Sequence, residues 1–229
     1  MNGGFIKWLW FSDSGSVVRV ACGVTFFIVL TMWDLHRHGR QAQRWREYVL
    51  LLSAVAAAVA YGIVNDQVTS AVSWEYFYYG KEGYLALGEQ TPPDRPALCL
   101  QAAKVGAKAT WTAGLVFGVA ILLANNPRRG LPRLGYGRLY RLLPLVLAAA
   151  AVCGLAVGLL GYFGAFSGAF PEIVQAGLWR PRRFMAAWSA HLGGYIGGFA
   201  GTAAAVCMVI RQRRRLRAAN QSDPPEVPA

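Results

Sequence analysis

The sequence is poor in charged residues. Lys, Arg, Asp and Glu make up 15% of its 229 residues, against about 25% in an average soluble protein. Hydrophobic residues make up 55%, and several uninterrupted runs approach the roughly 20 residues that a helix needs to cross a bilayer. Short segments of alternating polar and apolar residues, which are typical of a membrane-spanning barrel, are absent. These features exclude an ordinary soluble domain and predict a multi-pass, all-α membrane protein.

Several chemical motifs are missing as well. The chain has four cysteines but no C-x-x-C pair, and Cys22, Cys153 and Cys207 fall inside apolar runs, so neither a disulfide framework nor a zinc site is expected. No H-E-x-x-H, no G-x-S-x-G and no phosphate-binding glycine loop is present. His36 and His38 lie in a short basic segment, which favours a solvated loop over a metal site. The sequence therefore indicates no particular reaction, cofactor or metal.

Five apolar runs predict five spanning helices within one transmembrane domain, residues 1–217. The helices are expected at roughly 17–33, 46–64, 105–124, 142–166 and 186–210, and the second has the option of continuing to residue 79. Residues 80–104 are expected to form the longest polar connection, because their prolines interrupt helices. Residues 218–229 are expected to form a disordered tail.

The basic residues predict an orientation. The formal net charge is +12, and arginines follow the first, third and fifth apolar runs. Five spans place these three segments on one side of the membrane, so the positive-inside rule predicts a cytoplasmic C-terminus and an outer N-terminus. The composition, rich in Ala, Arg and Gly, favours a bacterial inner membrane. Contacts between these arginines and anionic lipid headgroups are expected, whereas nucleic acid is not an expected partner.

A polar stretch, residues 65–77, directly follows the second apolar run. Its carboxylates, amides and hydroxyls are costly near hydrocarbon unless they face protein or water. The five-span topology brings the starts of the third and fifth helices to the same side. At a rise of about 1.5 Å per residue, the polar groups there lie within roughly 10 Å of the interface. The sequence therefore predicts an outer-leaflet polar pocket made of Asn65, Asp66, Gln67, Glu75, Lys108 and His191.

Three functions are open for this pocket. It can bind a small polar ligand or an ion, with a possible transport role, since carboxylates and histidine bind cations and relay protons. It can also belong to a membrane-embedded enzyme that uses Asp66, Glu75 and His191 as acid and base. The third alternative is a network of interhelical hydrogen bonds in a scaffold protein.

Glycines recur at intervals of four in the last two apolar runs. Small residues at this spacing let two helices approach closely in a membrane. The pattern predicts a glycine zipper between the fourth and fifth helices, and it offers a surface for a homo-oligomer. The glycines concerned are Gly154, Gly158, Gly193, Gly197 and Gly201.

Residues 61–77 resemble a motif in uncharacterised bacterial multi-pass membrane proteins. The segment Asn65-Asp66-Gln67-Val68-Thr69 corresponds to an amide-rich N/H-D-Q-I-T, and Ser73-Trp74-Glu75-Tyr76-Phe77 corresponds to S-P-E-Y-F. Trp74 stands where that motif has proline, so the turn before Glu75 is expected to differ. The resemblance implies a shared membrane fold and no known activity, so it assigns no catalytic role.

Overall fold

The structure, a computed structural model, describes the chain except for residues 1–12, 82, 128–129, 169–176 and 223–229. Every regular element in the described part is a helix. The long helices are α2 (Asp13–His38), α3 (Trp45–Val72), α6 (Arg95–Ala124), α8 (Leu142–Tyr162) and α10 (Pro181–Ser222). The short helices η1 (Gly39–Gln41), α4 (Trp74–Tyr78), α5 (Tyr84–Leu87) and α7 (Tyr136–Tyr140) lie in the connections.

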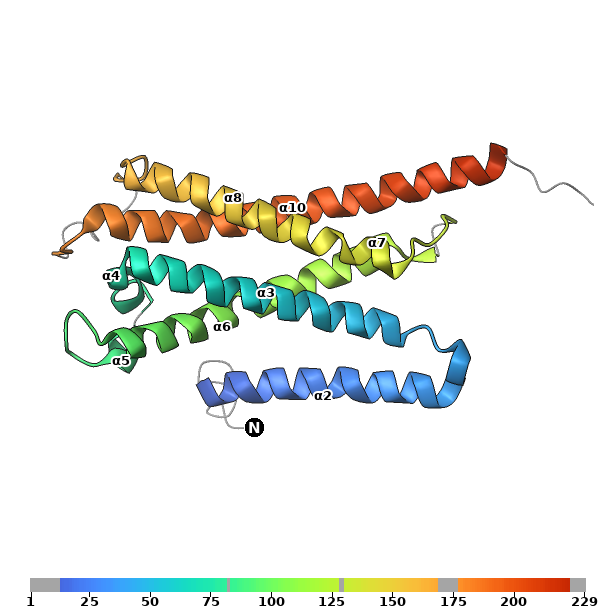
Figure 1. Ribbon diagram of the computed structural model, residues 1–229, viewed down its shortest axis with the longest axis horizontal. Helices are drawn as coiled ribbons and strands as arrows, with labels where there is room; N and C mark the ends of the chain where they lie inside the picture. The colour runs from blue at the N-terminus through green and yellow to red at the C-terminus, as the bar shows by residue number, and fades with distance from the viewer. Residues whose placement is uncertain (1–12, 82, 128–129, 169–176, 223–229) are drawn as a thin grey trace, which may run out of the picture.

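All five long helices are long and apolar enough to cross a membrane. They run alternately in opposite directions, so the start of α2 and the end of α10 face opposite ends of the bundle (Figure 1). The prediction of an all-α protein with five helices long and apolar enough to span a membrane is confirmed for the described part of the chain.

The helix ends differ from the expected ones. α6 begins at Arg95 rather than near residue 105, because the Asp94 side chain accepts a hydrogen bond from the backbone N–H of Ala97 and Pro96 needs no donor in a first turn. The proline-rich segment therefore starts a helix. α10 continues to Ser222, past the start of the expected tail, and residues 223–229 lie outside the described part.

The second spanning helix also passes its expected end. α3 continues through the polar stretch to Val72 and ends at Ser73, whose backbone is extended. The Ser73 side chain then accepts a hydrogen bond from the backbone N–H of Tyr76. This N-cap starts α4 as a separate helix, so α3 does not reach residue 79.

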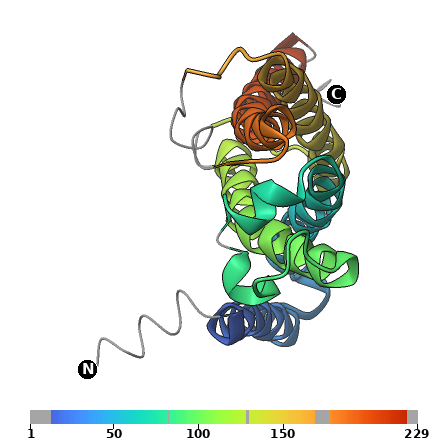
Figure 2. The same cartoon turned by 90° about the vertical axis from the view of Figure 1, so that its left-hand side faces the viewer.

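The long helices form two tight pairs, α3 with α6 and α8 with α10, and α2 packs beside α3 (Figures 1 and 2). Glycine allows the close approach of α8 and α10. A Cβ atom at Gly193 or Gly197 would collide with the backbone carbonyl of Cys153 or Ala149. All five glycines of the expected zipper are buried in this contact. Since they are covered within one chain, a homo-oligomer would need another surface.

The α3–α6 pair has an equivalent contact that the sequence analysis missed. Gly62 and Gly106 face each other so closely that a Cβ atom on either would meet the carbonyl oxygen of the other. Gly114 lies against the backbone of Ala54, and Gly118 lies against Leu51. The four-residue spacing of Gly114 and Gly118 was the signal in the sequence.

Arg213 joins α10 to the end of α6. Its side chain is fully buried and donates hydrogen bonds to backbone carbonyl oxygens of Ala124, Asn126, Leu131 and Pro132. The carbonyls at a helix C-terminus have no intrahelical partner, and this end of the helix dipole favours a cation. Arg213 thus fixes the end of α6 and the connection that follows it.

We expect Arg213→Ala to lower the free energy of unfolding by about 3 kcal/mol or more, because several charge-assisted hydrogen bonds disappear together. Denaturant titration of the purified protein in mixed micelles would measure this change. Arg214→Ala is the control, since Arg214 is exposed and its loss should change stability by no more than about 0.5 kcal/mol. Equal effects of the two substitutions would contradict the role of Arg213.

Two neighbouring glycines provide a test of the helix contact. Gly197→Ala should destabilise the protein by about 1–3 kcal/mol, because the added methyl group meets the α8 backbone. Gly198→Ala should leave stability unchanged or raise it slightly, because the nearest atom to its new Cβ, the Cβ of Ala150, is 4.0 Å away. Thermal unfolding of both variants in the same detergent would compare them.

Candidate functional site

Asp66 of α3 and His191 of α10 form a buried pair that links the two helix pairs. The His191 Nε2 atom lies 2.9 Å from Asp66 Oδ1, and the two side chains are 8% and 3% exposed. His191 Nδ1 lies 2.8 Å from the carbonyl oxygen of Ala187. A carbonyl can only accept, so Nδ1 carries a hydrogen. Nε2 and Oδ1 then share a single proton, and the pair is neutral overall whichever atom holds it.

The two carboxyl oxygens of Asp66 differ in their hydrogen bonding. Oδ1 accepts a hydrogen bond from Asn65 Nδ2 at 3.2 Å, in addition to its contact with His191. Oδ2 is buried and has no hydrogen-bond partner in the described part of the chain. Because the shared proton lies between Oδ1 and His191, Oδ2 is an acceptor in either protonation state. A buried acceptor left unpaired costs about 1–3 kcal/mol.

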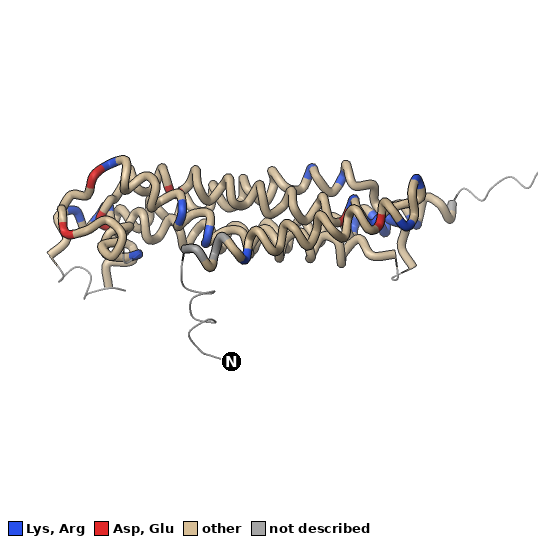
Figure 3. Tube along the Cα trace, turned by 90° about the horizontal axis from the view of Figure 1, so that it is seen from below, with Lys and Arg blue, Asp and Glu red and all other residues tan. Residues whose placement is uncertain are grey.

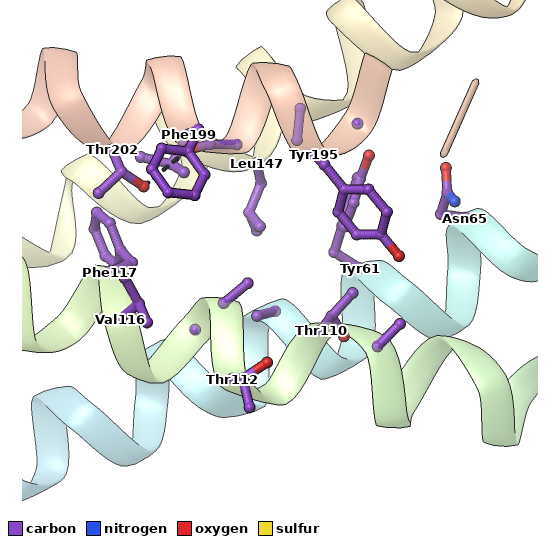
Figure 4. A pocket seen from close by; sticks show the side chains of 18 of the residues that line it. Tyr61, Asn65, Thr110, Thr112, Val116, Phe117, Leu147, Tyr195, Phe199 and Thr202 are labelled. Carbon is purple, nitrogen blue, oxygen red and sulfur yellow. Dashed lines mark hydrogen bonds between the residues drawn. The ribbon is translucent and has the colours of Figure 1, made fainter. Parts of the chain in front are cut away.

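A cavity of about 450 Å³ lies between the two helix pairs, and Asp66 and His191 are at one end of it. Figure 4 shows Tyr61, Asn65 and Tyr195 at that end and Phe117 and Thr202 at the other. Alanine, leucine, valine and phenylalanine make up most of the remaining wall. Its length along α3, from Ala54 to Asp66, is about 18 Å at the α-helical rise. The cavity is therefore long and apolar, with one polar end.

Aromatic side chains and a lysine surround the pair. The ring of Tyr76 lies on that of His191, with the two centroids 4.7 Å apart. Lys81 Nζ lies 5.5 Å from the centroid of the Tyr76 ring. Burial lowers the pKa of Lys81, and the Asp66 carboxylate opposes this shift. Burial raises the pKa of Tyr76, so this phenol stays neutral at physiological pH.

The tyrosines of the cavity were not predicted from the sequence. Their spacing carried a signal, because Tyr61 precedes Asn65 by four residues and Tyr195 follows His191 by four. Residues four apart share one face of a helix. Tyr76 and Lys81 carried no such signal, since the turn at Ser73 decides where they lie.

Only some of the six residues of the expected pocket line the cavity. Asn65, Asp66 and His191 meet at the cavity. Gln67 donates a hydrogen bond to the Cys99 carbonyl at 2.8 Å and so joins α3 to α6. Lys108 is exposed on α6. Neither Gln67 nor Lys108 lines the cavity.

Glu75 has a capping position outside the cavity. It is buried, and its carboxylate accepts hydrogen bonds from the backbone N–H groups of Trp179 at 2.6 Å and Arg180 at 3.1 Å. These two residues immediately precede α10, where a negative charge is favoured by the helix dipole. Glu75 therefore stabilises the start of the helix that carries His191.

The chemistry available at the pair is limited. The described residues contain no group of three or more His, Cys, Asp and Glu side chains that could hold a metal ion. Both ring nitrogens of His191 are engaged, so the ring offers no free lone pair to a reacting proton. The polar atom of the pair that has no partner among the described residues is Asp66 Oδ2, which is buried.

Substitution of the pair tests whether it acts as one unit. We expect His191→Leu alone to destabilise the protein by about 3–5 kcal/mol, because it leaves the Asp66 carboxylate buried without its partner. The double variant Asp66→Leu/His191→Leu should be closer to the wild type, since no buried polar group is left behind. Unfolding of both variants under identical conditions measures the difference. A double variant as unstable as the single one would contradict the coupling.

Comparisons with known proteins identify no relative. No protein-family profile matches the sequence, no curated protein is significantly similar to it, and no solved structure matches its fold significantly. The resemblance of residues 61–77 to a motif of bacterial membrane proteins stays a prediction.

Proposed function

We propose that this protein binds an amphipathic ligand inside the membrane. The apolar part of the ligand occupies the cavity between the two helix pairs, and its polar head lies at Asp66. The observation that carries this proposal is Asp66 Oδ2, a buried acceptor that has no partner among the described residues and belongs to a residue at the polar end of an apolar cavity. A donor on the ligand would complete the hydrogen bonding of this carboxyl group.

The cavity wall supports an amphipathic ligand over an ion. Binding sites for small molecules are mostly apolar, with a few polar groups that fix orientation, and this cavity has that composition. An ion that moved along the apolar wall would lose its hydration without replacement. Ion translocation, one of the functions left open by the sequence, is therefore less well supported.

An enzymatic role is also less well supported. It required Asp66, Glu75 and His191 to act together, but Glu75 caps α10. The described residues that line the cavity include no serine or cysteine. The hydroxyl groups of Thr110 and Thr202 donate hydrogen bonds to backbone carbonyls of their own helices, so neither is arranged as a nucleophile.

We further propose that the C-terminus is cytoplasmic and that the polar end of the cavity lies in the outer half of a bacterial inner membrane. Basic residues occur at both ends of the bundle (Figure 3), and arginines are more numerous in the segments that follow α2 and α6 and in the last part of α10, which supports this orientation. The exposed arginines in the last part of α10, Arg211, Arg214, Arg215 and Arg217, are suited to anionic lipid headgroups.

Native mass spectrometry tests ligand binding. The wild-type protein, purified from native membranes in mild detergent and incubated with their lipid extract, should carry a bound, extractable molecule. Occupancy should fall about tenfold or more in Asp66→Leu/His191→Leu, since a loss of about 1.4 kcal/mol is a factor of ten.

Glu47→Leu is the matched control. It also removes a carboxylate, but Glu47 pairs with Arg133 away from the cavity, so occupancy should be unchanged. A wild type without any bound molecule, or a double variant that retains it, would refute the proposal and leave the scaffold role.

A further inference from the structure

The cavity is open on one side. Its lining residues on α3 and α8 are all buried or half-buried. The exposed lining residues come only from α6 and α10, and they include Val116 at 58% and Phe199 at 80% exposure. Figure 4 shows Tyr195 and Phe199 on α10 across the cavity from Thr112 and Val116 on α6. The opening therefore lies between α6 and α10.

This opening faces the lipid. Val116 and Phe199 lie well inside the two spanning segments Arg95–Ala124 and Pro181–Gln221. Side chains exposed at that depth contact hydrocarbon, because the core of a bilayer holds no water. A water-soluble ligand has no direct route to this opening, whereas a molecule dissolved in the bilayer already lies beside it.

The pair at the polar end selects the head of the ligand. Asp66 Oδ2 accepts in either protonation state, so the head must donate a hydrogen bond. The pair is neutral overall, and Lys81 Nζ lies 5.5 Å from the centroid of the Tyr76 ring, which in turn contacts His191, so little net attraction remains for a cationic head. An anionic head would place its own lone pairs against Oδ2. A neutral hydroxyl group satisfies all three conditions.

Building on the proposed ligand-binding function, we propose that the ligand is a neutral long-chain alcohol that enters sideways from the bilayer between α6 and α10. Its hydroxyl group donates a hydrogen bond to Asp66 Oδ2, and its chain lies along the cavity. The length of about 18 Å from Ala54 to Asp66, at the α-helical rise, exceeds half of a hydrocarbon core about 30 Å thick. This length accommodates a chain about as long as the hydrocarbon depth of one leaflet.

Three photoactivatable amphiphiles test the head group. Diazirine-labelled hexadecanol, palmitic acid and hexadecylamine would each be added to phosphatidylcholine vesicles that contain the protein, and crosslinked peptides would be identified after irradiation. We expect hexadecanol to label cavity-lining peptides of α6 and α10 several-fold more than the acid or the amine. Preferential labelling by the amine or the acid would overturn the inference.

The variant Asp66→Asn separates hydrogen bonding from charge. Its amide nitrogen can donate to His191 Nε2 in place of the shared proton, the half-buried Asn65 amide turns away from it, and its oxygen takes the place of Oδ2, so hexadecanol labelling should persist. Labelling should be lost in Asp66→Leu/His191→Leu, which has no acceptor. Loss of labelling in a folded Asp66→Asn protein would show that the ligand recognises charge, and this would overturn the assignment to an alcohol.

Two valines on α6 test the route. Val116→Trp narrows the opening and should slow hexadecanol labelling several-fold. Val119→Trp is the control, since Val119 is also exposed but lies outside the cavity lining, and it should have no effect. Equal rates in both variants would refute lateral entry.

The two proposals can fail separately. If no probe labels the cavity but native mass spectrometry still finds a molecule that depends on Asp66 and His191, the alcohol is refuted and ligand binding stands. If both experiments find nothing, both proposals fail.

Discussion

Direct backbone contact within each helix pair determines the spacing of the whole bundle. At Gly62 and Gly106, and again at Gly193 and Gly197, no side chain separates the helices. Helices in lipid gain little from hydrophobic burial, so close packing of small residues supplies much of their association. The glycine contacts leave no space within either helix pair. The free volume of the bundle therefore lies between the two pairs, where it forms the cavity.

Two apolar clusters contain residues of both helix pairs, and a few polar residues add specific contacts between the pairs. Asp66 meets His191 near one end of the cavity, Glu75 caps the start of α10, and Arg213 holds the end of α6. Each of these groups is buried and has partners that water cannot easily replace. Arg213 lies near the far end of α10, whereas Asp66 and Glu75 act near its start, and the Asp66 carboxyl group belongs both to a structural link and to the candidate site.

The fold could be predicted because apolar runs of spanning length report directly on helices in a membrane. The helix ends could not be predicted in this way. Polar residues are part of α6 before its apolar run begins, from Arg95 on, and part of α10 after its apolar run ends at Ile210. Topology and helical rise were sufficient to bring Asp66 and His191 to the same end of the bundle. Glu75 was expected in the pocket but caps α10 instead. Its partners are backbone N–H groups of a connection far away in the sequence, and no pattern of side chains predicts such a contact. The cavity depends on packing in three dimensions and had no sequence signal of its own.

The attachments of α10 have a mechanical consequence. The helix is fixed near its start through Glu75 and near its end through Arg213, while its middle contains the glycines from Gly193 to Gly201. These glycines hold the middle of α10 directly against the backbone of α8, so α10 is attached at three levels along its length. Any change in the gap between α6 and α10 therefore has to move α8 together with α10.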